Sequence, residues 1–447
     1  MDKSIRHIAV DILTKISRDD VFASTLLDQK LDTYKLSQTP DGKLLTHLVY
    51  GVLRQKSYLD WIAAQFYKGK YETLDERIKN IFRISFFQFC FSDRLPAFAV
   101  VNEAVNIVKH FSPEKNGLVN AVLRNFLRRG KSISFPSFRK QPAEYISVYH
   151  SHPLWLVEKW INIFGPDDTM TLCKSNNEHP PLTIRVNTLK TSCENLKGIL
   201  ANDGFECIAT EFSPDGLILP HAPVPIQKTK YFLDGLLRLQ DEAAQLVSYL
   251  VNPKENESIF DACAGSGGKS THLAALIGNQ GGITAADSNH KIIDELKKEA
   301  ERMGITIIKT VTADLNVSLS GEFREKFDRV LVDAPCSGTG TLRRNPEIKW
   351  RLKPNNIQKL TSAQSNILLH ASQAVRRGGQ LIYCTCSLLP QENENIINHF
   401  LDANKSFSVF SPPSTMNQKL FDQRNFYRTY PHIHNMDGFF AAILKKA

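Results

Sequence analysis

The chain has 447 residues, long enough for about three domains of roughly 150 residues each. Its 42% hydrophobic and 23% charged residues are ordinary for a globular protein, and no apolar run approaches the roughly 18 residues of a membrane span. The 55 lysines and arginines exceed the 46 acids and give a net charge of +9. This excess favours a polyanionic partner, most simply nucleic acid, although a basic enzyme without such a partner has the same composition.

The N-terminus has no signal-peptide core, and the eight cysteines show no CxxC pair and no zinc-ligand spacing. We therefore expect a cytoplasmic protein with reduced thiols, no membrane association and no bound metal.

Residues 1–135 are expected to form an all-α domain, because apolar residues such as Ile5, Ile8 and Ile12 recur at helical spacing. Its last helix ends in a basic terminus, with Arg124, Arg128 and Arg129 before a glycine stop. These arginines fit either a favourable interaction with the helix dipole or contact with RNA phosphates.

The stretches 48–54 (Leu-Val-Tyr-Gly-Val-Leu-Arg) and 119–124 (Val-Asn-Ala-Val-Leu-Arg) resemble the NusB family of RNA-binding proteins. The resemblance implies an RNA-binding role for this first domain.

A loop rich in Ser, Pro, Lys and Arg (131–142) predicts a domain boundary, and residues 145–237 have a mixed pattern. We expect strands over 182–187, 205–210 and 216–219, and helices beginning at 152 and over 193–201. This small α+β module is expected to help select the RNA, and nothing in it resembles a catalytic group.

From 238 to 447 the order becomes strand, loop and helix repeated, which predicts a doubly wound, Rossmann-like parallel sheet. The expected strands are 258–263, 281–287, 305–311, 327–333, 380–385 and 439–444, and the expected helices are 270–277, 290–303 and 356–377.

A glycine-rich loop over 264–269 follows the first strand, where backbone N–H groups at a helix start can approach a ligand. Asp287 ends the next strand, a position from which an acid can bind ribose hydroxyls. NAD is one candidate ligand. S-adenosylmethionine is the better one, because Asp314 is placed to face the adenine side; the alternative for both acids is helix capping.

Two strand ends carry thiols. Asp333 and Cys336 follow one buried strand, and Cys386 follows another about fifty residues later. A thiolate that adds to C6 of a pyrimidine makes C5 electron-rich enough to accept a methyl group from a sulfonium. This chemistry needs a nucleophile, an acid near N3 and a base for the C5 proton, which these three residues can supply.

Asp-Ala-Pro-Cys-Ser-Gly-Thr-Gly (333–340), followed by Arg-Arg-Asn-Pro-Glu (343–347), and Tyr-Cys-Thr-Cys-Ser (383–387) resemble motifs of the NOL1/NOP2/Sun family of RNA 5-methylcytosine methyltransferases. The resemblance covers 258–444. With the two preceding modules, the whole chain is similar to bacterial members that act on 16S rRNA.

The resemblance implies that Cys386 is the nucleophile, that Cys336 assists release of the methylated RNA, and that Asp333 contacts the cytosine or the methyl donor. The implied cofactor-binding residues are Cys263, Ala264, Gly265, Ser266, Gly267, Gly268, Lys269, Asp287, Asp314 and Asp333.

The chain departs from the family pattern twice. The family loop usually reads Ala-Pro-Gly-Gly-Lys, whereas Gly265 and Ser266 precede Gly267 here, and a more flexible loop would weaken cofactor affinity. Cys384 stands where a small non-thiol residue is usual; it shares a strand face with Cys386, and we expect a spectator rather than a competitor on oxidation.

A basic loop with one aromatic residue follows the Pro-Cys motif and is expected to hold an unstacked RNA segment. The residues concerned are Arg343, Arg344, Lys349 and Trp350, and the alternative is a solvated charged loop. The target cytosine must leave its stack to reach a thiol.

The overall prediction is a monomeric, S-adenosylmethionine-dependent methyltransferase acting on C5 of a cytosine in 16S rRNA. The competing predictions are methylation of another nucleic acid such as tRNA or DNA, and a non-catalytic RNA-binding assembly factor. The sequence leaves open which cytosine is modified and whether naked RNA or a ribosomal particle is the substrate.

Overall fold

The computed structural model describes residues 3–19, 21–92, 95–130 and 133–447. They form two compact units, Met1–Glu178 with Leu342–Leu352 and His179–Thr341 with Lys353–Ala447. The segment Leu342–Leu352 therefore lies between two stretches of the second unit in sequence but folds with the first unit.

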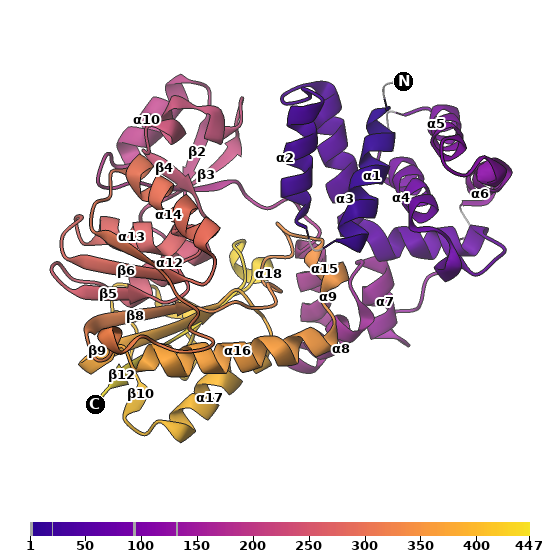
Figure 1. Cartoon of the computed structure of the whole chain (residues 1–447). Helices are drawn as coiled ribbons and strands as arrows, with labels where there is room; N and C mark the ends of the chain where they lie inside the picture. The colour runs from indigo at the N-terminus through magenta and orange to yellow at the C-terminus, as the bar shows by residue number, and fades with distance from the viewer. Residues whose placement is uncertain (1–2, 20, 93–94, 131–132) are drawn as a thin grey trace. The chain divides into compact units, whose positions relative to one another are not determined.

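The first unit is built from helices around one apolar core (Figure 1). They are α1 (Ile5–Arg18), α2 (Ala23–Thr33), α3 (Pro40–Phe66), α4 (Glu76–Phe91), α5 (Ala97–Lys109), α6 (Asn116–Arg129), α7 (Pro142–Tyr149), α8 (Leu154–Phe164), α9 (Pro166–Ser175) and α15 (Ile348–Arg351). Local sequence sets the helix starts: the hydroxyl of Ser4 caps α1, and Pro40 occupies the first turn of α3. The stripe Ile8, Ile12 and Ile16 is buried, as its helical spacing predicts.

The helical unit continues past the boundary expected near residue 135 to Glu178, because α7 packs against α3. The backbone N–H of Ser57 in α3 donates to the hydroxyl of Ser151, 2.8 Å away, just beyond α7. The helix expected to open the α+β module is thus part of the helical unit.

The second unit begins with a four-stranded antiparallel sheet in the order β2-β3-β1-β4. Its elements are β1 (Thr183–Val186), α10 (Cys193–Asn202), β2 (Glu206–Ala209), β3 (Gly216–His221), α11 (Lys230–Leu233) and β4 (Leu237–Leu239). The first three strands agree with the prediction to within about two residues, the usual uncertainty of element ends. The short strand β4 was not predicted.

The larger sheet has the order β10-β12-β9-β8-β5-β6-β7, with β11 paired to β12. Strands β5 to β9 are parallel, whereas β10, β11 and β12 are antiparallel additions at one side. The strands are β5 (Ser258–Asp261), β6 (Gly282–Asp287), β7 (Ile308–Thr312), β8 (Phe327–Asp333), β9 (Val375–Thr385), β10 (Phe407–Val409), β11 (Tyr427–Thr429) and β12 (Phe439–Lys446).

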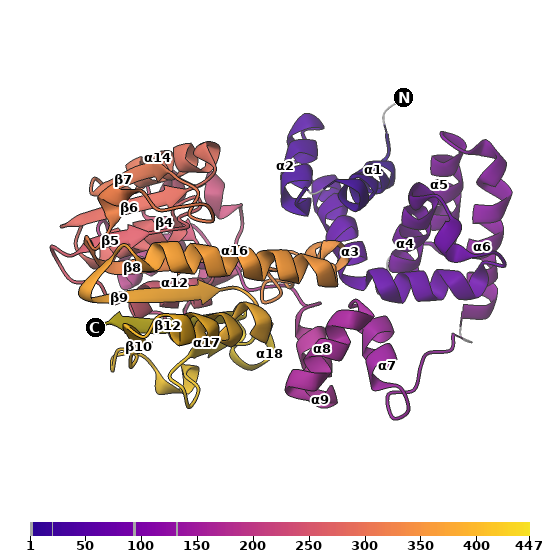
Figure 2. The ribbon, with the colours of Figure 1, turned by 60° about the horizontal axis from the view of Figure 1, so that its bottom comes forward.

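Helices cover both faces of this sheet (Figures 1 and 2). Side chains of α12 (Glu242–Val251), α13 (Gly268–Leu276) and α14 (His290–Met303) pack on one face, and those of α16 (Pro354–Ser372) and α17 (Glu394–Ala403) pack on the other. The apolar run Val330–Val332 of β8 is consequently fully buried, as expected of a central parallel strand.

Helix α16 ends at Ser372, earlier than the predicted 377, because Val375 already pairs with Phe327 in the sheet. Tertiary pairing therefore overrides an apolar pattern that continues at helical spacing.

The chain runs outward from β5 to β6 and β7 and then returns to β8 on the other side of β5. This reversal leaves a crevice at the carboxyl ends of β5 and β8, the place where sheets of this kind bind ligands. In the part of the chain that the structure describes, no helix is long and apolar enough to cross a membrane. Within the same residues, no group of three or more His, Cys, Asp or Glu side chains is placed to hold a metal ion.

Candidate active site

The two thiols of the predicted site lie side by side. Cys336 follows β8 and Cys386 follows β9, and these strands are parallel neighbours in which Asp333 is paired with Cys384. Their Sγ atoms are 3.3 Å apart, and both side chains are half-buried. The structure therefore brings together two residues fifty positions apart, as the strand ends predict.

The two thiols are not equivalent. The hydrogen bond with Cys386, burial and the negative charges of Cys386 and Glu392 together raise the pKa of Cys336 well above its ordinary value. Cys336 is therefore expected to keep its proton in this arrangement.

Asp333 is held by two neighbours. The ammonium of Lys269 donates to Oδ2, and the Sγ of Cys384 donates to Oδ1 at 3.3 Å. Burial opposes the charged form of Lys269, but the negative charge of Asp333 prevails and raises the pKa of the ammonium. Burial and the Asp333 charge also raise the pKa of Cys384, which favours the inert thiol expected there.

A cavity of 280 Å³ opens at the carboxyl ends of β5, β6, β7 and β8. It is lined by Ala262, Cys263, Asp287, Ser288, Ala313, Asp314, Leu315, Asp333, Pro335 and Ile367. Four of these residues, Cys263 and the three aspartates, are among the predicted cofactor-binding residues. Ala262, Ser288, Ala313, Leu315, Pro335 and Ile367 are additional, and Ile367 belongs to α16, about 34 residues beyond Asp333, the nearest predicted acid in sequence.

The glycine loop is placed beside this cavity by Asp287. The backbone N–H of Gly265 donates to the Asp287 carboxylate over 3.1 Å. Gly267 has a φ of +84°, and a Cβ there would lie 2.9 Å from the Leu296 side chain, so this position requires glycine. Residues 264–269 are not among the residues that line the cavity, and their direct contact with a cofactor stays a prediction.

A buried carboxylate that the sequence did not reveal joins the two thiol loops. Glu392 accepts hydrogen bonds from the backbone N–H of Ser337 at 2.8 Å and from Gln364 at 3.0 Å. Its other oxygen accepts from the hydroxyls of Ser337 and Ser387. Ser337 follows Cys336 and Ser387 follows Cys386, so one carboxylate fixes both loops; its place after a strand end was the only signal in the sequence.

In the predicted RNA-binding loop, the structure differs from the prediction at Lys349. Its side chain is 0% exposed, and its ammonium donates over 2.9 Å to the carbonyls of Arg54 and Ser151 and to the side chain of Asn177. All of its donors are thus used inside the helical unit, and the prediction that Lys349 contacts RNA is wrong.

Other residues of that loop are also held by the helical unit. The indole N–H of Trp350 donates to the carbonyl of Leu53 at 2.7 Å, and Arg343 is only 7% exposed, with its guanidinium 3.6 Å from Glu178. Arg344 is half-buried. For Arg343 and Trp350 the structure favours an anchoring role over RNA contact.

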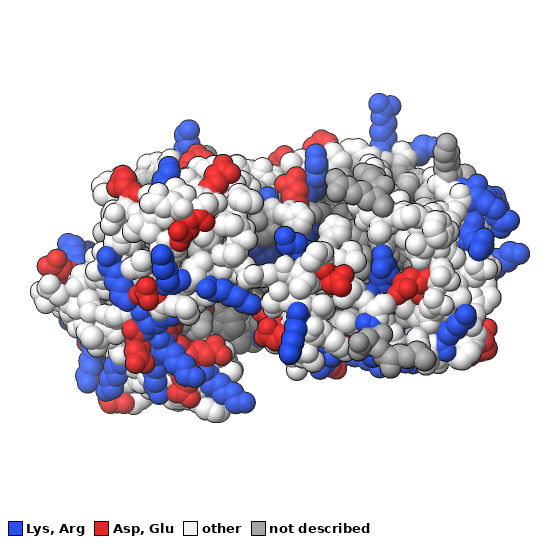
Figure 3. Space-filling view, turned by 90° about the horizontal axis from the view of Figure 1, so that it is seen from above, with Lys and Arg blue, Asp and Glu red and all other residues white. Residues whose placement is uncertain are grey.

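The arginines of α6 have a different environment. Arg124, Arg128 and Arg129 are exposed, and Lys and Arg side chains gather on the part of the helical unit that contains α5 and α6 (Figure 3, right). Their contact with RNA phosphates stays a prediction.

Comparison with known proteins divides the chain into three parts. Family models match the NusB family over residues 3–128, the ferredoxin-like domain of RsmF/B-like methyltransferases over 152–227, and the 16S rRNA methyltransferase RsmB/F over 248–445. The predicted all-α NusB-like domain, α+β middle module and Rossmann-like methyltransferase domain are thereby confirmed.

Two curated relatives match the chain from end to end. It is 33% identical over 453 residues to the probable ribosomal RNA small subunit methyltransferase B of Bacillus subtilis (strain 168), covering 99% of each chain. It is 35% identical over 455 residues to the corresponding protein of Synechocystis sp., covering 99% of this chain and 100% of the relative.

Among solved structures, the crystal structure of PH0851 is similar with a TM-score of 0.82 and 28% identity over 100% of both chains. The paired strand-end thiols, the acid-lined cavity and these full-length matches agree with one another, and the chain belongs to the 16S rRNA methyltransferase RsmB/F family.

Proposed function

We propose that the protein transfers a methyl group from S-adenosylmethionine to C5 of a cytosine in 16S rRNA, through a covalent bond between Cys386 and C6. The observation that carries the proposal is the 3.3 Å separation of the Cys336 and Cys386 sulfurs at the carboxyl ends of β8 and β9. Membership of the family and the names of the curated relatives support rRNA as the substrate.

The residues of the cavity fit S-adenosylmethionine. Asp287 and Asp314 supply carboxylate acceptors for ribose hydroxyls and for an adenine amino group, while Leu315 and Ile367 supply apolar surface for a flat ring. Asp333 puts a third negative charge at the end of the cavity closest to the thiols, where it would face a sulfonium. The bound cofactor would supply an electrophilic methyl group.

In the first step, the thiolate of Cys386 forms a bond to C6 of the cytosine, and the electron pair of the C5–C6 bond moves towards C5 and N3. Asp333 lies beside Cys384 at the end of β8, and Lys269 is bound to it. The ammonium of Lys269 can offset the negative charge that develops on the ring. C5 would then take the methyl group, with the electron pair of the broken bond staying on the donor's sulfur and leaving S-adenosylhomocysteine.

Release requires the C5 proton to be removed and the bond between C6 and Cys386 to break. Cys336 is suited to remove this proton after the adduct has formed, because a major cause of its raised pKa is the free thiol or thiolate of Cys386. Once Cys386 is a neutral thioether, that hydrogen bond and that charge are gone. The pKa of Cys336 then falls, although burial still raises it. Once its own proton has passed to water, the thiolate can take the C5 proton while the bond between C6 and Cys386 breaks.

RNA recognition is assigned to the exposed arginines of α6, Arg124, Arg128 and Arg129, and to Arg344. Contacts of this kind to phosphates position an RNA without reading its sequence.

The roles of the thiols are tested with RNA that contains 5-fluorocytosine, which traps the adduct because its C5 carries no removable proton. The wild-type protein is expected to form an adduct that survives denaturing gels, and Cys386→Ala is expected to form none. Cys336→Ala is expected to accumulate the adduct with ordinary RNA. The opposite assignment of the two variants would show that the Pro-Cys thiol is the nucleophile.

The substrate is tested separately, with 16S rRNA, 30S particles, tRNA and DNA offered together with radiolabelled S-adenosylmethionine. Label is expected in 16S rRNA, with bisulfite sequencing locating the methylated cytosine. Label in tRNA alone would show that tRNA is the substrate, and the proposed reaction would stand. Absence of label from all four would favour an assembly factor.

A further inference from the structure

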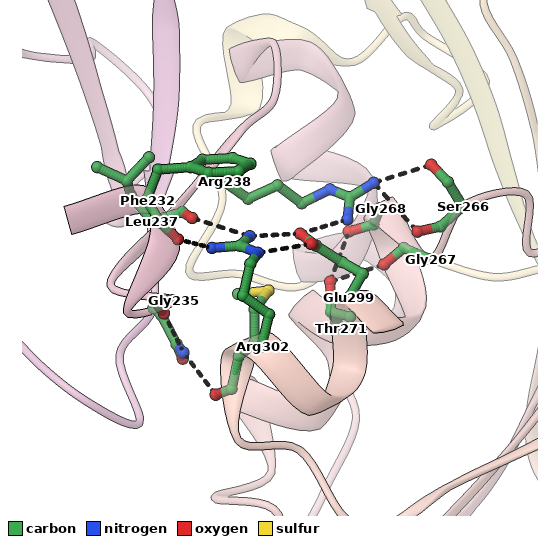
Figure 4. A network of polar contacts seen from close by, with 12 residues as sticks. Phe232, Gly235, Leu237, Arg238, Ser266, Gly267, Gly268, Thr271, Glu299 and Arg302 are labelled. Atoms are coloured by element: carbon green, nitrogen blue, oxygen red, sulfur yellow. Dashed lines mark hydrogen bonds and ion pairs between the residues drawn. The ribbon is translucent and has the colours of Figure 1, made fainter. Parts of the chain in front are cut away.

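Two arginines of the four-stranded sheet β2-β3-β1-β4 bind the glycine loop. Arg185 of β1 and Arg238 of β4 are direct partners in the antiparallel pair. Arg238 donates to the hydroxyl of Ser266 at 2.9 Å and to its carbonyl at 3.2 Å, and Arg185 donates to the carbonyl of Gly268 at 2.6 Å (Figure 4 shows Arg238, Ser266 and Gly268). Both guanidiniums thus bind oxygens of the glycine loop.

The arginine pair is costly where it stands, since like charges opposite each other on neighbouring strands destabilise a sheet. Arg185 is 0% exposed, and burial together with the charge of Arg238 lowers its pKa to about 9. Glu299 of α14 neutralises Arg238 with an oxygen 2.6 Å from its guanidinium. The two guanidiniums are thus placed to donate hydrogen bonds to the carbonyls of Ser266 and Gly268.

The direction of these bonds matters for a ligand. In a trans peptide the carbonyl and the N–H point to opposite sides, so a carbonyl of Gly268 bound by Arg185 turns the N–H of Lys269 the other way. The first N–H groups of a helix have no partner within the helix, and α13 begins at Gly268. The arginines therefore fix which way the free donors of this helix start face.

Ser266 provides the side-chain half of this contact. It stands where the family pattern has proline, a residue that stiffens a loop by fixing φ. Here the Ser266 hydroxyl is tied to Arg238 instead, so a hydrogen bond to the neighbouring module limits the freedom of a loop that also contains Gly265 and Gly267.

We propose that Arg238, together with Arg185, is a positioning residue for the cofactor. It holds the glycine loop in its binding conformation through Ser266, and the four-stranded sheet is therefore a structural part of the cofactor site. This inference rests on the proposed use of S-adenosylmethionine. It does not depend on which base or RNA is methylated.

The test measures binding of S-adenosylhomocysteine to the full chain by calorimetry without RNA, in wild type and in Arg238→Met, Arg238→Lys, Ser266→Ala and Arg302→Met. Arg302→Met is the matched control: Arg302 also binds Glu299, at 2.6 Å, and its remaining bonds go to the carbonyls of Phe232 and Leu237, none of which belongs to the loop (Figure 4).

Arg238→Met is expected to raise Kd about tenfold, Ser266→Ala about threefold, and Arg302→Met less than about twofold. Arg238→Lys, which keeps one charged donor, is expected to fall between wild type and Arg238→Met. Ser266→Ala is expected to add less than about twofold in the Arg238→Met background, because the two residues act through one contact. In turnover assays the KM for S-adenosylmethionine is expected to rise while kcat at saturation stays within about twofold of wild type.

Equal losses in Arg238→Met and Arg302→Met, or fully additive effects of the Arg238 and Ser266 variants, would reduce Arg238 to a general stabilising residue and overturn the inference. An unchanged Kd in a folded Arg238→Met protein would do the same. Failure of the wild type to bind S-adenosylhomocysteine would overturn the proposed function and the inference with it, whereas label in an unexpected RNA would leave the inference standing.

Discussion

The sulfurs of Cys336 and Cys386 lie 3.3 Å apart and share a hydrogen bond. Either sulfur can be the donor of this hydrogen bond, so the two thiols are in direct contact. This contact leaves the pair open to oxidation.

Hydrogen peroxide is expected to join Cys336 and Cys386, with two thiols and one peroxide giving a disulfide and two waters. The protein, which has eight free cysteines, should lose two titratable thiols and its methyl-transfer activity, and dithiothreitol should restore both. Thiol titration after unfolding and peptide mapping measure the outcome. A bridge mapped to Cys384 instead would show that this third thiol is a competitor and not a spectator.

Exchange of Glu392 for glutamine is expected to lower kcat about ten- to a hundredfold, because an amide accepts fewer of the bonds that hold the Ser337 and Ser387 loops. Affinity for S-adenosylhomocysteine should change less than about twofold, since Glu392 does not line the cofactor cavity. Glu394→Gln is the control: it removes an acid two residues away that pairs with Arg428 at 3.1 Å. Equal kinetic losses in both variants would contradict a specific role for Glu392.

The salt dependence of RNA binding distinguishes a residue that contacts phosphate from a lysine that is buried in the fold. Arg128→Gln is expected to reduce the slope of log K against log salt by about 0.7 to 0.9, one phosphate contact. Lys349→Met should leave this slope unchanged and lower the free energy of unfolding by about 3 kcal/mol, because the carbonyls of Arg54 and Ser151 and the amide of Asn177 lose their donor. A reduced slope in folded Lys349→Met protein would restore this residue to the RNA interface.

Asp261 predicts a pH dependence of stability. Burial raises the pKa of Asp261 from 3.8 to about 6. The negative charge of Asp333 adds to this increase, and the hydrogen bond from Ser270 opposes it. The folded-state pKa of Asp261 is raised, so its contribution to stability is complete below pH 3.8 and is lost as pH rises to about 6. Over this window wild type should lose about 3 kcal/mol relative to Asp261→Asn, which does not titrate. Denaturant unfolding at pH 4, 5, 6 and 7 measures the difference, and parallel curves for the two proteins would refute the assignment.

The amino-acid sequence by itself determined the strands that end in Asp287, Asp333 and the Thr-Cys motif of Cys386. A continuous apolar run predicts a buried parallel strand, and the residue after that run must lie at the carboxyl edge of the sheet. The proposed catalytic residues are local to such runs, which is why short motifs predicted where they would lie.

The tertiary structure decided which charged side chains are buried and which distant atoms they contact. Lys349 looks like an RNA ligand in a basic loop, yet the carbonyl that accepts from it belongs to Arg54, 295 residues earlier in the chain. The same holds for Glu392, for Arg238 and for the boundary after Glu178, each of which depends on contacts between segments far apart in sequence. Periodicity describes which face of an element is apolar, but it carries no information about which distant backbone atoms will meet a charged side chain, and that meeting decides whether the charge binds a ligand or supports the fold.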